Sequence, residues 1–302
     1  MDQSLVSVGD NCAPLEPDWP IRFLPSDSAS SQSGSPFVAI VRSRAELGRW
    51  LINPPAGLQW LQVDELLGDQ DAWIPAAQST SNVPLDVFIT SPGSQFSDLY
   101  NLVDVLAIRD VRVSMPASPG FLRALKMAVA LRLPVRLLPG QPSPEVLIEL
   151  IEAVNFYLRD SMVETPVEFF HSVLASICGT GDGSLWMILE EDPALFLHRT
   201  VEGGFKLRGV SSSTSPDLLS ATFVDTWFKR LLEQNAECMT CPWHQICQGY
   251  FKWPYPTYDC KGVKQLFSAI EAVANEMGRE LACRDRMGLE KDVGKLGAMA
   301  TT

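Results

Sequence analysis

The chain has 302 residues, 46% of them hydrophobic, and a formal net charge of -12 from 24 basic and 36 acidic residues. This length allows two domains with a sizeable core, and the acidic surface disfavours binding to nucleic acid or anionic membranes. No apolar run is long enough for a transmembrane helix, and the first residues lack the basic and apolar regions of a signal peptide. We therefore expect a cytoplasmic protein, in which clustered cysteines point to metal or redox chemistry.

The N-terminal part predicts an arm followed by a sheet domain. Residues 1–36 are rich in Ser, Pro and Asp, which is typical of a disordered or loosely draped arm. Over 37–164, apolar β-rich segments alternate with helical ones, which predicts an α/β fold with a reduced, partly parallel, partial-barrel-like sheet. About five strands are visible, too few for a complete eight-stranded barrel. The main expected strands are 37–41, 86–90, 111–115 and 134–138, and the helices are 44–51, 94–106, 121–131 and 143–159, with 53–83 irregular.

The second half predicts a small cysteine-rich domain over 165–286 and a flexible tail over 287–302. An amphipathic helix follows Cys260, with apolar residues at helical spacing up to Met277. The other expected elements are helices at 165–178 and 216–234 and strand-like runs at 184–189 and 194–198.

The most informative segment holds four of the seven cysteines, with the spacing C-x2-C-x5-C-x12-C from Cys238 through Cys241 and Cys247 to Cys260. Four thiolates this close can complete a tetrahedral set for zinc or hold an iron–sulfur cluster. Zinc ribbons favour two similar C-x2-C pairs, and this set has only one. Many aromatic residues surround it, and such an apolar shell suits a cluster whose potential depends on burial. A structural zinc site is the alternative.

The run Cys238-x2-Cys241-x5-Cys247-Gln-Gly249, with Cys260 downstream, resembles the SPASM extension of radical S-adenosylmethionine enzymes. In that family these positions bind an auxiliary [4Fe-4S] cluster. The resemblance covers about 165–280 and implies a complete ligand set for one such cluster in this chain.

The chain also departs from that family. Phe251 stands where another cysteine is expected, and Cys178, Pro193 and His198 occupy the frame in which the family has Cys, Gly and Cys. The C-x3-C-x2-C motif that binds the catalytic cluster is absent from the whole sequence. The resemblance therefore implies a degenerate member that is not catalytic alone.

The other candidate ligands have simpler interpretations. Cys178 is expected as a buried thiol at a helix end and His198 as a satisfied polar residue at a strand end, although either could bind metal. No catalytic residue is assigned. The remaining candidates, all expected to be structural or incidental, are Cys12, His171, His244 and Cys283.

The resemblance implies a partner protein of a genuine radical S-adenosylmethionine enzyme, in a hetero-oligomer that modifies a ribosomally made peptide. The protein would present the substrate peptide or relay electrons. Two alternatives stay open: a zinc-stabilised protein-binding module, and an enzyme that uses the α/β domain and has a purely structural metal site.

Overall fold

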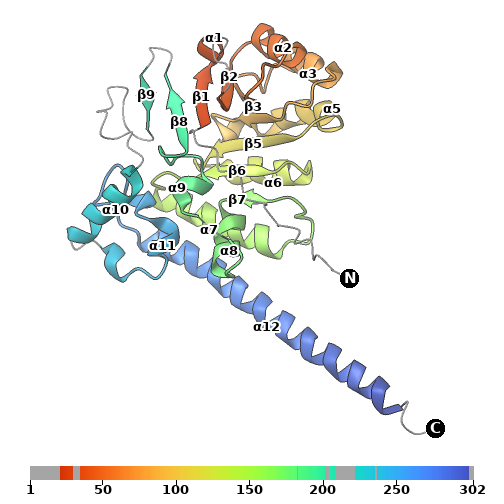
Figure 1. The fold of residues 1–302 in the computed structure, drawn as a ribbon, viewed down its shortest axis with the longest axis vertical. Coiled ribbons are helices and arrows are strands. Elements are labelled where there is room, and N and C mark those ends of the chain that lie inside the picture. Colours follow the sequence, from red (N-terminus) through yellow and green to blue (C-terminus); the bar gives the residue numbers. More distant parts are fainter. Residues whose placement is uncertain are drawn as a thin grey trace, which may run out of the picture.

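The computed structural model describes residues 21–29, 35–181, 183–200, 204–207, 222–234 and 237–298, and the side chains as far as residue 279. Eight parallel strands and one antiparallel strand form a single sheet (Figure 1). The strands are β1 Ile21–Pro25, β2 Phe37–Val41, β3 Leu58–Asp64, β4 Leu85–Phe88, β5 Val111–Pro116, β6 Val135–Leu138, β7 Val167–Glu168, β8 Phe196–Arg199 and the antiparallel β9 Phe205–Lys206.

Helices follow most of the strands, as the α/β prediction requires. The α-helices are α1 Ser26–Ala29, α2 Arg44–Ile52, α3 Ile74–Gln78, α4 Pro92–Gln95, α5 Val103–Leu106, α6 Phe121–Ala130, α7 Pro144–Arg159, α8 Phe170–Ile177, α9 Leu185–Ile188, α10 Phe223–Glu233, α11 His244–Cys247 and α12 Lys261–Ala298. Short 3-10 helices are η1 Gln70–Trp73, η2 Phe96–Leu102, η4 Glu237–Thr240 and η5 Tyr250–Lys252. No helix in these described ranges is long and apolar enough to cross a membrane.

The strand order is β7-β6-β5-β4-β3-β2-β1-β8-β9. Strand β8 returns to pair with β1 in parallel, as the last strand of an eight-stranded parallel barrel does. Among the described strands, however, β7 and β8 do not pair, so the sheet is a curled half-barrel that stays open at this point. The opening gives other segments access to the concave face.

Strands β4 to β6 bury apolar side chains on one face and turn charged side chains to the other, whereas Phe23, Val38 and Ile40 of β1 and β2 form a small apolar cluster of their own. In β4, Leu85 and Val87 belong to the large buried core, whereas Asp86 points to the opposite, concave face. Arg112 and Arg136 are likewise the second residues of β5 and β6. In the register of the sheet, Arg112 lies opposite Asp86, and Arg136 lies opposite Ser114. The concave face therefore carries charged side chains rather than a purely apolar filling.

The sheet has more parallel strands than the sequence indicated. Strand β1 lies within the segment expected to be a disordered or loosely draped arm, so that prediction is wrong for residues 21–29. Residues 1–20 and 30–34 lie outside the described part. Strand β3 lies in the segment expected to be irregular. A search for continuous apolar runs missed this strand because its buried residues, Leu61 and Val63, alternate with the less buried Trp60, Gln62 and Asp64.

Three further expectations need correction. The predicted helix over 165–178 begins with the short strand β7, and α8 follows it. The strand expected at 184–189 is instead α9, because Ser184 caps its N-terminus by accepting a hydrogen bond from the backbone of Met187. The predicted tail at 287 begins inside α12, which continues to Ala298.

The cysteine-rich half does not have a separate core in the described residues. One cluster of buried side chains extends from the outer face of the sheet to Cys238, Phe251 and Cys260. Helix α12 starts directly after Cys260 and packs along α7, and Cα of Gly262 approaches Leu147 so closely that an added Cβ would lie 2.3 Å from its Cδ1. The predicted second domain is therefore fused to the sheet domain through a continuous core.

A buried ion network occupies the concave face. Arg136 donates to Asp86 at 2.9 Å, to Ser114 at 2.9 Å and to Glu190, and Arg112 donates to Asp86 at 2.6 Å and to Glu190 at 2.7 Å. Glu190 follows α9 and has a left-handed backbone, φ 60°, which is uncommon for a residue with a side chain. The network therefore holds the segment after α9 inside the open half-barrel.

Asp86 is the most buried charge of this network, with 1% of its side chain exposed. Burial alone would raise the pKa of its carboxyl, but attraction to Arg136 and Arg112 and the hydrogen bond from Ser114 outweigh burial and lower the pKa. A carboxyl with a lowered pKa in the folded state stabilises that state at pH values above its unfolded pKa of about 3.9. This stabilisation is lost as the pH falls through the lowered value.

We expect Asp86→Asn to reduce the free energy of unfolding by about 3 kcal/mol at pH 7, because it leaves the buried guanidinium of Arg136 and the half-buried one of Arg112 undercompensated. The difference from the native chain should start to shrink below about pH 4, where the carboxyl of the unfolded chain becomes protonated, and should be lost as the pH falls through the lowered native pKa. Denaturant unfolding at pH 7, 4 and 3 measures both effects. Asp71→Asn is the matched control, since Asp71 is 68% exposed, and it should change stability by less than about 0.5 kcal/mol. Equal effects of the two substitutions would contradict this role of the network.

Candidate metal centre

The four clustered cysteines lie on four neighbouring pieces of backbone. Cys238 is in η4, Cys241 follows it, Cys247 ends α11, and Cys260 immediately precedes α12. The turn is closed by backbone hydrogen bonds from Cys241 to the carbonyl of Cys238 at 3.3 Å and from Cys247 to the carbonyl of Trp243 at 2.9 Å. The C-x2-C and C-x5-C spacings thus correspond to two successive tight turns.

Gly249 makes the tight packing behind Cys247 possible. Its φ is 72°, and an added Cβ would lie 2.4 Å from Leu231 and 3.1 Å from Trp227 of α10. Its carbonyl accepts a hydrogen bond from the indole of Trp227 at 3.1 Å. Helix α10 is therefore seated directly against the loop that carries the thiols.

All four thiols line a single cavity. Cys238 and Cys260 are buried and Cys241 and Cys247 are half-buried. The remaining lining comes from α10, η4, the loop around α11, η5 and α12, and comprises Phe228, Glu237, Trp243, His244, Gly249, Lys252, Val263, Lys264 and Phe267. The ring of Trp243 stacks on Phe267 with centroids 5.6 Å apart. The thiols thus face a largely apolar, aromatic surrounding.

Two lysines supply positive charge beside the thiols. Lys252, 7% exposed, donates to Glu237 at 2.8 Å, and Lys264 donates to the other oxygen of Glu237 at 2.6 Å. The backbone N–H of Cys260 donates to the same carboxylate at 3.2 Å. Burial alone would raise the pKa of Glu237, but these two ammonium groups lower it to about 2. One carboxylate against two ammonium groups leaves an excess of one positive charge next to the cysteines.

Three of the four thiols, those of Cys238, Cys247 and Cys260, are held in their neutral form near neutral pH when no metal is bound. Burial, and then repulsion between neighbouring thiolates, raises the pKa of Cys247 to about 11 and of Cys260 to about 12, and it also raises that of Cys238. At least one of the other cysteines contributes to the raised pKa of each of these three thiols. Such a set becomes deprotonated only when a cation binds between the sulfurs.

The donor set suits a thiolate-bound metal, although the side chains are not arranged as a finished site. In the described part of the chain, no group of three or more His, Cys, Asp or Glu side chains forms a ready-made site for one metal ion. Four thiols on one cavity, with adjacent ammonium groups, still match the chemistry of a tetrathiolate site, which is anionic with zinc or with a cubane cluster. Ligation by Cys238, Cys241, Cys247 and Cys260 stays a prediction.

The structure does not bring Cys178, His198 or Phe251 to this cavity. Cys178 is at the end of α8 as expected but is exposed rather than buried. His198 lies in β8, stacks on Phe23 with centroids 4.0 Å apart and contacts the carbonyl of Glu190 at 3.0 Å. Phe251, at the position where the SPASM pattern has a cysteine, is fully buried and packs against Phe267.

The histidines are accounted for by local contacts. His244 lines the cavity but its Nδ1 contacts the carbonyl of Cys241 at 2.8 Å, and its ring stacks on Phe228. His171 contacts the hydroxyl of Tyr157 at 2.9 Å. Cys12 and the side chain of Cys283 lie outside the described part.

Sequence reasoning missed Glu237, Lys252 and Lys264, and it missed the concave face of the sheet. The available signal for the concave face was a polar residue at every second position of successive strands, as in Gln62 and Asp64. These residues face a cavity rather than solvent.

Neither a family model nor a curated protein nor a solved structure matches this chain. The chemistry of the candidate centre must therefore be argued from its own residues.

In metal-free protein at pH 8, we expect a thiol alkylating reagent to modify Cys178 well before Cys247 or Cys260. The thiolate is the reactive species, and thiols with pKa values of about 11 and 12 are ionised in only about one molecule in a thousand or fewer at that pH. Peptide mass spectrometry over time separates the sites. Equal rates at Cys178 and Cys247 would contradict the burial described.

Proposed function

We propose that the protein binds one [4Fe-4S] cluster through Cys238, Cys241, Cys247 and Cys260. The observation that carries the proposal is that these four thiols, from separate turns, line the same cavity. The excess positive charge of Lys252 and Lys264 over Glu237 supports an anionic occupant. The aromatic surrounding supports a cluster, whose potential is set by burial and hydrogen bonding.

A cluster held at every corner by cysteine would transfer electrons or stabilise the fold, with no iron left open for a substrate. The chain contains no C-x3-C-x2-C motif. We therefore infer a non-catalytic accessory subunit of a radical S-adenosylmethionine enzyme that modifies a ribosomally made peptide, as the resemblance to the SPASM extension implies. The subunit would relay electrons or present the peptide.

The surface beside the cysteines supports docking of such an enzyme. Met239 is 58% exposed between Cys238 and Cys241, and Tyr255 is 67% exposed on the following loop. Exposed apolar side chains of this size are common at interfaces. Because Cys241 is only half-buried, a cluster would lie close to this part of the surface.

We expect protein purified without oxygen to contain about four irons and four sulfides per chain. Cys247→Ala should lose both and the visible absorbance of the cluster, since it removes one ligand. Cys178→Ala is the matched control and should keep the full content, because Cys178 is exposed and does not line the cavity.

One zinc per chain without sulfide would instead support the zinc-stabilised binding module. Iron content unchanged by Cys247→Ala would remove this residue from the ligand set. Cleavage of S-adenosylmethionine by the isolated protein would overturn the accessory role and favour the alternative of an enzyme that uses the α/β domain.

We expect the protein to co-purify with a radical S-adenosylmethionine enzyme encoded beside it when the two are co-expressed. Met239→Asp should weaken this association at least tenfold without changing the iron content, because it places a charge in the apolar contact. Ile52→Asp is the control, since Ile52 is 83% exposed at the end of α2. Surface plasmon resonance measures the affinity of the native chain and of both variants for the enzyme. No association, or equal effects of both substitutions, would contradict the proposal.

A further inference from the structure

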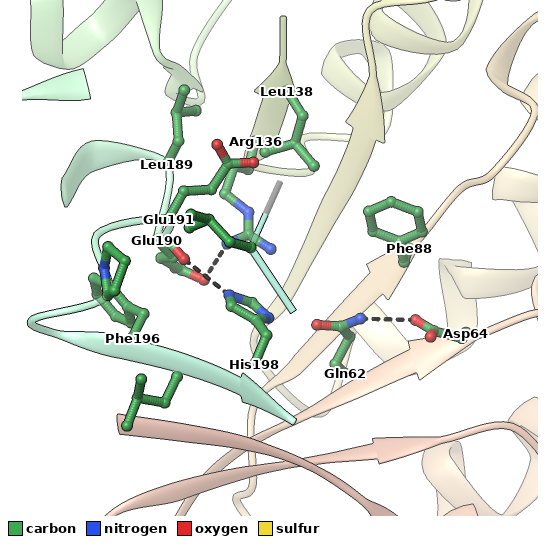
Figure 2. A pocket seen from close by; sticks show the side chains of 13 residues that line it. Gln62, Asp64, Phe88, Arg136, Leu138, Leu189, Glu190, Glu191, Phe196 and His198 are labelled. Carbon is green, nitrogen blue, oxygen red and sulfur yellow. Dashed lines mark hydrogen bonds and ion pairs between the residues drawn. The ribbon is translucent and has the colours of Figure 1, made fainter. Parts of the chain in front are cut away.

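The concave face of the half-barrel holds a second cavity, separate from the thiols (Figure 2). Its volume is about 370 Å³, within the range of small-molecule sites. It lies where β3, β4 and β6 end, at Asp64, Phe88 and Leu138. Ligands of parallel sheets bind preferentially at the carboxyl ends of the strands.

The guanidinium group in this cavity is already paired. Each nitrogen of Arg136 donates to a partner inside the network: Ser114, Asp86 or Glu190. The network contains two carboxylates, Asp86 and Glu190, and two guanidinium groups, Arg112 and Arg136, so its charges balance. Arg136 therefore does not offer a free charge to an anionic ligand.

Asp64 carries a negative charge on the lining that its partners compensate only in part. Asp64, with 14% of its side chain exposed, accepts a hydrogen bond from Gln62 at 2.9 Å and has one weaker ion pair, at 3.4 Å, with the largely solvated Arg42. Burial raises the pKa of Asp64, and the nearby Asp86 adds repulsion. Glu191 contributes a second carboxyl to the lining. A positive charge placed here would relieve an undercompensated carboxylate.

Apart from His198, which contacts the carbonyl of Glu190, the rest of the lining is apolar and aromatic. Figure 2 shows Phe88 next to Asp64, with Phe196 and Leu189 across the cavity and the carboxyl of Glu191 in the same space. Aromatic faces attract ammonium and guanidinium groups, and apolar walls accommodate the aliphatic stem that carries them. The lining therefore combines a counter-ion with a surface for an alkyl chain.

We propose that this cavity binds a basic amino-acid side chain, a primary ammonium or guanidinium group on an aliphatic stem, with Asp64 as its counter-ion. The site would take a free basic amino-acid derivative or a basic residue of a peptide. It does not depend on the occupant of the cysteine cavity, so the two proposals are tested separately.

The test uses the full chain and two probes in which only the side chain is charged, Nα-acetyl-lysine amide and Nα-acetyl-arginine amide. Nα-acetyl-norleucine amide has the lysine stem without the ammonium group, and Nα-acetyl-glutamate amide has the opposite charge. Ligand-observed NMR titration gives the dissociation constants. We expect at least one basic probe to bind at least tenfold more tightly than both controls. Equal binding of the norleucine probe, tighter binding of the glutamate probe, or no binding of either basic probe would overturn the proposal.

A substitution locates the site. Asp64→Asn keeps the shape and should weaken the bound basic probe at least tenfold, whereas Asp71→Asn, on the exposed surface, should leave it unchanged. Thermal unfolding confirms that both variants are folded. If Asp64→Asn does not fold, Phe88→Leu is used in its place. This substitution removes the aromatic face but keeps an apolar wall, so it should weaken binding of the basic probe at least threefold. Undiminished binding in the folded variant would overturn the assignment.

Discussion

The buried network of Asp86, Arg112, Arg136 and Glu190 determines how the rest of the molecule can be arranged. Charges this deeply buried are tolerated only when each is paired, and three adjacent strands supply only part of the set. The missing carboxylate comes from Glu190, which enters through the opening between β7 and β8. The sheet therefore needs the segment after α9 to neutralise its concave face, and that segment needs the sheet to hold its left-handed backbone.

The same short helix links the network to the thiols. Trp186, on α9, is fully buried, donates to the carbonyl of Gln248 at 3.2 Å and packs edge-on against Tyr250 with centroids 5.2 Å apart. On the other side of the loop, Gln141 donates to the carbonyl of Phe251 at 2.9 Å. The cysteine turns are thus fixed to the sheet from two directions, which explains why the expected second domain shares the core of the first.

Sequence reasoning found what local spacing encodes and missed what distant partners decide. The four cysteines were recognisable because their spacing alone brings three of them into adjacent turns, and β2, β4, β5 and β6 were recognisable as apolar segments. Strand β3 was missed because Trp60, Gln62 and Asp64 alternate with its core residues, and β7 because it has only two residues. Glu190 carries no local signal, since its role depends on arginines more than 50 positions away.

The two cavities differ in how far their charges are compensated by protein groups. On the concave face the network closes on itself, and Asp64 at its edge has a single, weaker ion pair with Arg42. In the cysteine cavity, the ammonium groups of Lys252 and Lys264 share the single carboxylate of Glu237, and the thiols beside them resist ionisation. Deprotonating the buried thiols near neutral pH would require a cation among them, and the lysines would then stabilise the resulting anionic centre. The lysines are therefore placed where they would favour the proposed metal-bound form of the four thiols.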